Sequence, residues 1–423
     1  MDGEQSVRRE LANALDEVTS AGGPALPDIK ATPRHILPVI VFAQFAGTSL
    51  WFAGNAIAAD LRQAFSLTAG ATGNLTAVVQ LGFIAGTLVF GMLAIADRFS
   101  SSRVFFACAI AGAFFNGCLA WLASGLGSLL AFRFLTGFFL AGIYPVGMKI
   151  SADWFARDLG RALGWLVGAL VLGTAFPHLL RALGASFSWQ MVVTATSALA
   201  LLGGALLFFA VGDGPHRRPA PEFEWSAIPR IFRSPDFRAA AFGYFGHMWE
   251  LYAMWAFTPL LLAAYNTAHG TTIPVALWSF LVIATGSLGC VSGGYVSLKR
   301  GSPRVAFGML LTSGICCVLS PILFLSPTWI FLPFLLIWGF SVVGDSPQFS
   351  SLVAKAAPSE YIGTALTIVN SLGFALTIVS IQLLSRIESR VGANWWFLLL
   401  APGAVFGLVS MSRLHSNTVK ERE

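Results

Sequence analysis

Two titratable side chains, His247 and Glu250, lie three residues apart in an apolar stretch long enough to cross a membrane. A carboxylate at bilayer depth costs roughly 3 kcal/mol, so it persists only where it is paired, hydrated or protonated. An imidazole titrates near neutral pH and can exchange protons there. Asp345 and Arg133 lie in two other apolar stretches. His247, Glu250 and Asp345 predict a site for proton coupling, and Arg133 is a buried cation whose partner must be found.

Each of the four residues also has a structural interpretation. His247 and Glu250 could hydrogen-bond to each other and fix their helix in place. Asp345 follows Gly344 and precedes Pro347, a context that predicts a bent or locally opened helix, where the carboxylate could bond a freed backbone group. Arg133 could pair with a substrate carboxylate, with Glu250 or with a backbone carbonyl. The sequence alone leaves these alternatives open.

The elements that position these residues are membrane spans. The chain has 423 residues, 56% of them hydrophobic and 11% charged, with a mean hydropathy of +0.73. Apolar runs of about 20 residues, the length that crosses a bilayer core, recur along it. The predicted spans are 36–57, 73–96, 104–124, 128–150, 161–180, 190–211, 239–264, 276–298, 304–325, 328–350, 361–384 and 393–411. This pattern predicts an all-α membrane protein with twelve transmembrane helices.

An internal repeat divides these spans into two groups of six. Residues of the first half recur in the second at offsets of 200 to 202: Gly137, Gly142 and Pro145 as Gly339, Gly344 and Pro347, Arg103-Val104 as Arg304-Val305, and Phe42 and Phe45 as Phe242 and Phe245. Repeated bundles are typical of secondary transporters, whose substrate site lies between the repeats. We therefore predict two bundles, 36–211 and 239–412, a linker over 212–238, and tails over 1–35 and 413–423.

Lys and Arg residues set the predicted orientation. With the N-terminus in the cytoplasm, 21 of the 26 lie in cytoplasmic segments, four in outer loops, and Arg133 lies within a span. This asymmetry predicts cytoplasmic termini, and the short loops suggest a bacterial inner (plasma) membrane. The net charge of +6 follows from this topology and gives no basis for nucleic-acid binding. The five cysteines fall within spans and predict neither disulfides nor a metal site.

Polar and aromatic residues recur at helical spacing on a few predicted spans. Such faces cannot contact lipid, so they contact another helix or a cavity. Hydrogen-bonding groups beside aromatic walls favour a small organic solute over a bare ion. The predicted substrate-binding residues are Gln44, Trp51, Asn55, Tyr252, Trp255, Gln348 and Asn370. Aromatic residues at this spacing are also common in plain helix packing, which is the alternative.

The loop after the second span, Asp97-Arg98-Phe99-Ser100-Ser101-Ser102-Arg103, is similar to a signature of the major facilitator superfamily. Arg133 with Gly137 resembles that family's Arg-x-x-x-Gly motif, and Trp154-Phe155 with 160–164 resembles its loop into the fifth span. The resemblance covers all but the two tails. It departs at 100–102, where serines replace Gly and basic residues, and at Leu298, where an Asp is expected.

The resemblance implies the major facilitator fold and alternating access, with the first, fourth, seventh and tenth spans lining the cavity. It also implies a link between Arg133 and proton coupling, and a gate at the inner end. The predicted gating residues are Asp97, Arg98, Arg103, Lys149 and Asp153.

We predict a secondary active transporter that moves a small organic solute across the lipid bilayer together with protons. It is expected to be a monomer and to need no cofactor. The sequence contains no phosphate-binding Gly-rich motif, so ATP is not expected to drive transport, and it contains no nucleophile elbow or zinc-binding helix, so an enzyme is not expected. A metal or metal-chelate carrier of the same fold is one alternative. A non-transporting receptor or assembly scaffold is another, with the apolar stripe of Val7, Leu11, Leu15 and Val18 docking a partner.

Overall fold

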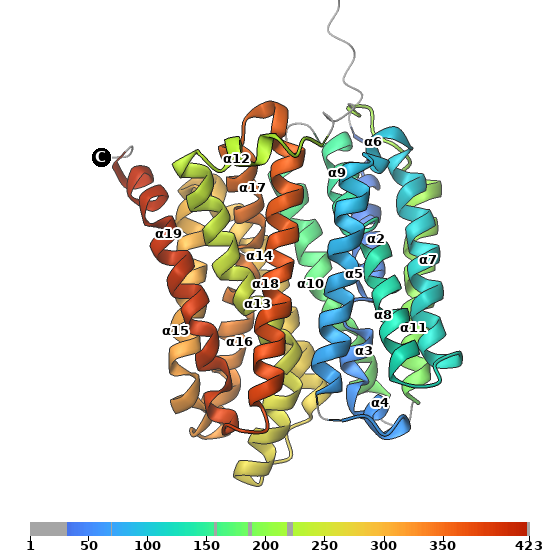
Figure 1. Ribbon diagram of the computed structural model, residues 1–423, viewed down its shortest axis with the longest axis vertical. Helices are drawn as coiled ribbons and strands as arrows, with labels where there is room; N and C mark the ends of the chain where they lie inside the picture. The colour runs from blue at the N-terminus through green and yellow to red at the C-terminus, as the bar shows by residue number, and fades with distance from the viewer. Residues whose placement is uncertain (1–31, 69, 156–158, 185–187, 218–222, 421–423) are drawn as a thin grey trace, which may run out of the picture. The chain divides into compact units, whose positions relative to one another are not determined.

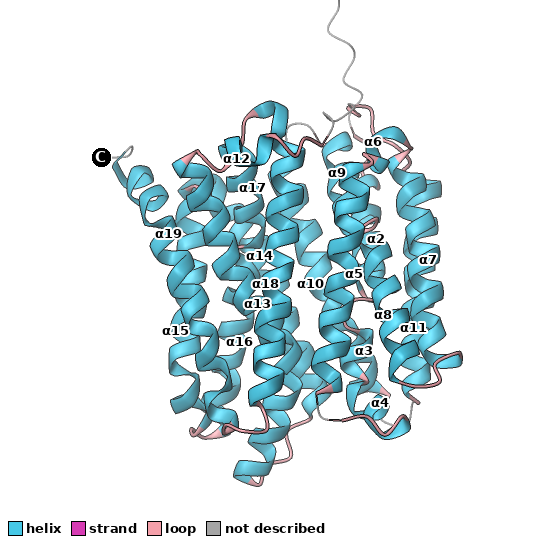
Figure 2. Cartoon of the chain, in the orientation of Figure 1, coloured by secondary structure: helices cyan, strands magenta, loops and turns pink. Residues whose placement is uncertain are grey.

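The computed structural model describes residues 32–68, 70–155, 159–184, 188–217 and 223–420. The apolar stripe of Val7 to Val18 lies outside the described residues. The chain from His35 onward forms one compact unit. The described residues form helices joined by short loops, without any strand, which confirms the all-α prediction (Figure 2).

The helices of the first half run to the start of the linker. They are α2 (Ile36–Thr48), α3 (Ala53–Ala56), α4 (Ala58–Ala64), α5 (Ala71–Met92), α6 (Ile95–Arg98), α7 (Ser101–Trp121), α8 (Leu126–Leu140), α9 (Tyr144–Trp154), α10 (Leu159–Leu183) and α11 (Trp189–Ala210).

The linker contains α12 (Ala227–Ile231), and the second half follows it. Its helices are α13 (Pro235–His269), α14 (Val275–Arg300), α15 (Ser302–Phe324), α16 (Thr328–Gly344), α17 (Ser346–Ala356), the 3₁₀ helix η1 (Ser359–Tyr361), α18 (Ile362–Ile387), the 3₁₀ helix η2 (Ala393–Leu400) and α19 (Ala401–Lys420).

Ten of the twelve predicted spans are helices long and apolar enough to cross a bilayer. The first predicted span is shorter because it is interrupted: α2 ends at Thr48, and α3 begins at Ala53. The seventh predicted span is α13, a continuous helix of 35 residues. Its polar residues, including Asp236, His247 and Glu250, lower its hydropathy, and most of its length is enclosed by other helices.

The two halves lie side by side, α2–α11 on one side and α13–α19 on the other (Figure 1). They meet along two helix pairs, α10 with α14 and α5 with α18. We call the end that carries α6 and α12 the linker end, and the other end, which carries α4, the opposite end. At the opposite end the two halves are joined by a hydrogen bond of 3.1 Å from Gln382 Nε2 to Asn74 Oδ1.

The internal repeat has a counterpart in the packing. A Cβ atom on Gly137 of α8 would collide with the carbonyl oxygen of Val79 on α5, and one on Gly339 of α16 would collide with that of Val282 on α14. Glycine lets two helices approach at backbone distance, as is common in membrane bundles. The repeated glycines therefore permit the same close helix–helix contact in both halves.

Both Gly–Pro segments of the repeat interrupt their helices, and the second of these breaks, at Asp345, was predicted. α8 ends at Leu140 and α9 begins at Tyr144, and α16 ends at Gly344 and α17 begins at Ser346. Pro145 and Pro347 each stand in the first turn of the second helix, where a missing N–H is tolerated. Asp345 is the junction residue of the second break.

We expect Gly339→Ala to destabilise the protein by about 1–3 kcal/mol, because the added methyl group must push α16 away from α14. The measurement is the thermal unfolding midpoint in detergent. Gly308→Ala is the matched control: Gly308 lies in α15 with no atom within 4 Å of the new methyl group. That control should keep or raise the midpoint, since Ala favours the helix by up to about 1 kcal/mol. Equal midpoints for both variants would contradict the close-packing role of Gly339.

Candidate functional site

An aromatic cluster joins the two halves near the middle of the bundle. Trp51, in the break between α2 and α3, stacks on Tyr252 of α13 and on Phe374 of α18, with ring centroids 5.7 Å apart in both pairs. Phe83 of α5 lies 4.5 Å from the ring of Phe374. Trp255 meets the ring of Tyr252 edge-on at 5.4 Å. Since such contacts stabilise an interface beyond their buried area, this cluster holds the halves together.

A small cavity lies beside this cluster and is lined from both halves. The first half contributes Tyr144, Val167 and Leu170, and the second contributes Tyr244, Met248, Leu251, Tyr252, Trp255, Val343, Ser346, Ser350 and Phe374. Its volume is about 30 Å³. Pockets that bind organic ligands usually measure about 300–1,000 Å³, so this cavity has room for water but not for an organic solute. The helices must separate before a solute can enter.

Of the seven residues predicted to bind substrate, Tyr252 and Trp255 line this cavity. The other residues on the first span are engaged inside the first half. Trp51 Nε1 donates to Gln80 Oε1 at 3.1 Å, and Asn55 Nδ2 donates to Thr76 Oγ1 at 2.7 Å. These polar side chains of the first span therefore also form hydrogen bonds between helices.

Three more of the predicted substrate residues lie outside the cavity lining. Gln44 is fully buried, its amide has no hydrogen-bond partner among the described residues, and Oε1 lies against Gly147 of α9. Gln348 is buried in α17, and Asn370 is half-buried in α18. The unpaired amide of Gln44 can form hydrogen bonds with a new partner once the neighbouring helices move.

Arg133 supports the break in the first span. The residue is fully buried in α8, and its guanidinium donates to the backbone carbonyls of Leu50, at 3.0 Å, and Trp51. These carbonyls are freed because the helix is interrupted after Thr48. Of the three partners considered for Arg133, the structure shows the backbone carbonyl. The guanidinium thus fixes the segment that carries Trp51.

Glu250 is fully buried and faces the interior of the second half. Its Oε1 accepts a 2.6 Å hydrogen bond from Trp338 Nε1 on α16, and its Oε2 accepts one of 3.0 Å from Ser313 Oγ on α15. Neither Trp338 nor Ser313 was predicted from the sequence. The sequence feature that could have indicated this contact is the indole N–H of Trp338, because a buried indole needs a hydrogen-bond acceptor.

His247 is paired with Asp345 rather than with Glu250. Its Nδ1 lies 2.9 Å from Asp345 Oδ1, and its Nε2 lies 2.8 Å from Ser346 Oγ. His247 and Asp345 are almost completely buried, whereas Ser346 lines the cavity. The helix break between α16 and α17 presents Asp345 and Ser346 together to one imidazole. The three side chains form a polar chain that leads from the cavity to a buried carboxylate.

Charged residues predicted to form a gate gather at the linker end. Lys149 Nζ lies 2.7 Å from Asp97 Oδ1 and 4.0 Å from Asp153 Oδ1. This arrangement ties α9 to α6. Arg98 and Arg103 are exposed, and no ion pair with an acid is found for them among the described residues. The structure thus brings three of the five predicted gating residues together.

Asp213, at the start of the linker, binds the serines that depart from the family signature. Its Oδ1 accepts hydrogen bonds of 3.0 Å from Ser100 Oγ and from the backbone N–H of Ser102. Arg217 Nη1 lies 3.3 Å from Asp213 Oδ2, and its Nη2 donates to the carbonyl of Asp97 at 2.9 Å. The negative charge of Asp213 at the N-terminus of α7 also interacts favourably with the helix dipole. The sequence prediction missed this role of Asp213.

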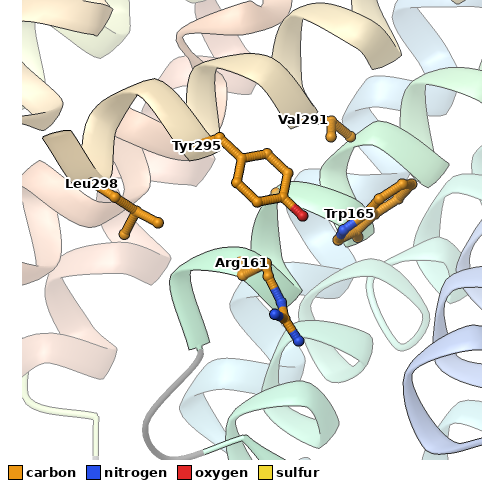
Figure 3. A pocket seen from close by; sticks show the side chains of 7 residues that line it. Arg161, Trp165, Val291, Tyr295 and Leu298 are labelled. Atoms are coloured by element: carbon orange, nitrogen blue, oxygen red, sulfur yellow. The ribbon is translucent and has the colours of Figure 1, made fainter. Parts of the chain in front are cut away.

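A shallow groove between α10 and α14 lies away from all the predicted site residues. Figure 3 shows Tyr295 of α14 pointing toward Trp165 and Arg161 of α10. The side chains of Trp165, Tyr295 and Leu298 are exposed, as suits a surface that faces lipid. Beneath them, Gly164 and Gly294 bring the two helices into close contact.

We expect Asp213→Asn to lower the thermal midpoint at neutral pH and to matter less in acid. Burial raises the pKa of Asp213, but the bonds from Ser102 and Ser100 and the charge of Arg217 lower it further, so its pKa lies below the ordinary value of 3.8. Its stabilising effect is therefore complete above about pH 4 and lost as the pH falls through the lowered pKa. Asp236→Asn, which removes an exposed acid paired with Arg413, is the control. A midpoint difference from wild type that grows in acid would contradict this role for Asp213.

Comparison with known proteins gives relatives that are all transporters. A metabolite transport protein of Haemophilus influenzae is 34% identical over 141 residues, 32% of this chain and 33% of that protein. A galacturonate transporter of Dickeya chrysanthemi is 26% identical over 200 residues, 42% of this chain and 56% of that one. A niacin transporter of Acinetobacter baylyi is 32% identical over 130 residues, 27% of this chain and 28% of that one. The matched stretches span about a third to just over half of these relatives.

Solved structures share the fold at low sequence identity. A bacterial homologue of the human lysosomal transporter spinster, in an inward-facing and unoccupied conformation, has a TM-score of 0.65 at 15% identity, over 92% of this chain and 98% of that one. The nucleoside transporter NupG has a TM-score of 0.66 at 13% identity, over 90% and 98%. The family model of the major facilitator superfamily matches residues 39–381. With the paired bundles and the cavity between them, this match shows that the chain belongs to the major facilitator superfamily of membrane transporters.

Proposed function

We propose that this transporter carries a small organic solute by alternating access, coupled to the movement of protons. The named relatives act on a metabolite, galacturonate and niacin, which are small organic compounds. The cavity lies between the two halves, where such a site is expected, and it is closed to an organic solute in this structure. The rocking of one half against the other would open it toward either side.

The observation that carries the proton proposal is the chain from Ser346 through His247 to Asp345. A buried carboxylate is costly unless a cation or a proton compensates it. When His247 is protonated, the His247–Asp345 pair is neutral overall; when His247 is neutral, the pair carries one net negative charge. Proton binding therefore stabilises the buried pair, and the hydroxyl of Ser346 places that event next to the solute.

Glu250 and Arg133 have different parts in this proposal. Glu250 accepts hydrogen bonds from α15 and α16, so it fastens α13 to the rest of the second half. Arg133 holds the break that presents Trp51 to the second half. Glu250 is then a fixed contact and His247–Asp345 the exchanging pair, although both acids were predicted for the proton site.

The excess of Lys and Arg supports an orientation with the linker end on the cytoplasmic side. The contacts of Asp97, Lys149 and Asp153 then form part of the inner gate of a bacterial inner membrane protein. Asn74 and Gln382 join the halves at the outer side. In this arrangement the inner and outer contacts break in turn. As the helices separate, four further polar residues are proposed to reach the solute: Gln44, Asn55, Gln348 and Asn370. The protein is proposed to act as a monomer.

We expect Asp345→Asn to abolish proton-driven accumulation of solute in proteoliposomes while solute counterflow continues. An amide cannot provide the negative charge that makes protonation of His247 favourable, but it keeps the shape of the junction. Glu250→Gln is the comparison: as a fixed contact, it should lower the thermal midpoint and reduce both assays in parallel. Accumulation that survives in Asp345→Asn, or is lost selectively in Glu250→Gln, would transfer the proton role to Glu250.

Ser346→Ala should reduce the rate of proton-coupled uptake on the order of tenfold, because the cavity loses its hydrogen bond to His247. The measurement is solute-induced acidification of vesicles that contain a pH dye. Ser320→Ala is the matched control, since the hydroxyl of Ser320 is buried in α15 and bonds the carbonyl of Cys317 in its own helix. Equal rates for both variants would remove Ser346 from the proposed proton path.

A further inference from the structure

The cavity wall carries no charged side chain. The acids that the sequence suggested for it are engaged elsewhere, Glu250 with Trp338 and Ser313, and Asp345 with His247. Twelve residues line the cavity, all of them apolar, aromatic or hydroxyl-bearing. A cationic solute would therefore find no carboxylate on this wall, and a bare anion would find no cation.

What the wall does carry is a set of hydrogen-bond donors. Trp255 is fully buried and lines the cavity, and its Nε1 has no partner among the described residues. The hydroxyl groups of Tyr144, Tyr244 and Tyr252 belong to residues of the same wall and add further donors there. An indole N–H can only donate, and a buried donor left unpaired costs about 1–3 kcal/mol. A solute with acceptor oxygens would satisfy these donors.

The apolar part of the wall is flat. The rings of Tyr252, Trp255 and Phe374 lie together, with Tyr252 5.2 Å from Phe374 and 5.4 Å from Trp255. Aromatic rings pair well with one another in offset-stacked or edge-to-face arrangements, so this wall suits a solute with a flat aromatic ring. No Asp, Asn or Gln side chain is among the described residues that line the closed cavity, so a solute with many hydroxyl groups would find no carboxylate or amide partner on this wall.

We infer that the cavity selects a small planar monocarboxylic acid, whose oxygens accept from the indole N–H of Trp255 and the phenol groups. This inference rests on the proposed transport function. One carboxylate and one proton cross together, so the load is neutral, with the proton held by the chain of Ser346, His247 and Asp345. No covalent bond is made or broken apart from the transfer of that proton.

The test is equilibrium binding to the full-length protein in lipid nanodiscs, with benzoate, cyclohexanecarboxylate and benzylammonium as probes. Benzoate should bind, more tightly at pH 6 than at pH 8, since binding takes up a proton. Cyclohexanecarboxylate, with the same charge but a puckered ring, should bind several-fold more weakly, and benzylammonium should not bind. Preference for benzylammonium, or equal binding of the two acids, would overturn the inference.

Two variants test the donors directly. Tyr252→Phe keeps the ring and removes the hydroxyl group, and Trp255→Phe replaces the indole by a smaller ring without an N–H; each should weaken benzoate binding on the order of tenfold. Tyr252→Phe removes no hydrogen bond found among the described residues, so its thermal midpoint should hold, whereas Trp255→Phe shrinks a buried side chain and should lower the midpoint. The matched controls are Trp249→Phe and Tyr265→Phe, whose polar atoms donate to the carbonyls of Leu399 and Ser326 away from the cavity. Benzoate affinity that is equal in all four variants would refute the assignment of Trp255 and Tyr252.

Proton flux in proteoliposomes, screened in parallel, separates this inference from the proposed function. If an amine or a polyol drives proton movement while benzoate neither binds nor moves, the transport proposal stands and the acid inference falls. If benzoate binds as expected but no solute moves protons or exchanges in counterflow, the transport proposal falls and the binding inference stands.

Discussion

A polar group inside a bilayer has no water to bind, so the protein itself must satisfy it, and the interior of this transporter is arranged around that constraint. The guanidinium of Arg133 bonds carbonyls freed by a broken helix. Glu250 is held by an indole and a hydroxyl group, and Asp345 by an imidazole. Every one of these contacts lies within a single half. Between the halves, the described contacts are aromatic rings, close backbone contacts and the neutral hydrogen bond from Gln382 to Asn74, which can separate at lower cost than a buried ion pair.

The two halves share their packing but differ in their chemistry. Gly137 and Gly339 bring equivalent helices together, yet the first half completely buries the guanidinium of Arg133, whereas the second half completely buries the carboxyl groups of Glu250 and Asp345. Arg133 keeps its charge at any physiological pH. In the proposed mechanism, the pair that exchanges protons, His247 and Asp345, lies in the second half.

Sequence reasoning predicted the fold well because span length, the repeat and the Gly–Pro breaks are local properties. The interruption at Asp345 follows from Gly344 and Pro347, and the structure confirms it. The partners of the charged residues were not predictable, since helical spacing places His247 and Glu250 on one side of α13 without naming the neighbour that each one meets. The size of the cavity depends on the packing of aromatic rings from α9, α13 and α18, which cannot be deduced from any pattern along the chain.

The uncharged cavity wall also bears on the energetics of the membrane itself. Moving one elementary charge through a membrane potential changes its energy by about 2.3 kcal/mol per 100 mV. Walls made of Tyr, Trp, Phe and Ser residues carry no gating charge, so the potential exerts no force on them. A neutral load in such a cavity would make transport electrically silent. Accumulation would then follow the pH difference across the membrane and be indifferent to its voltage.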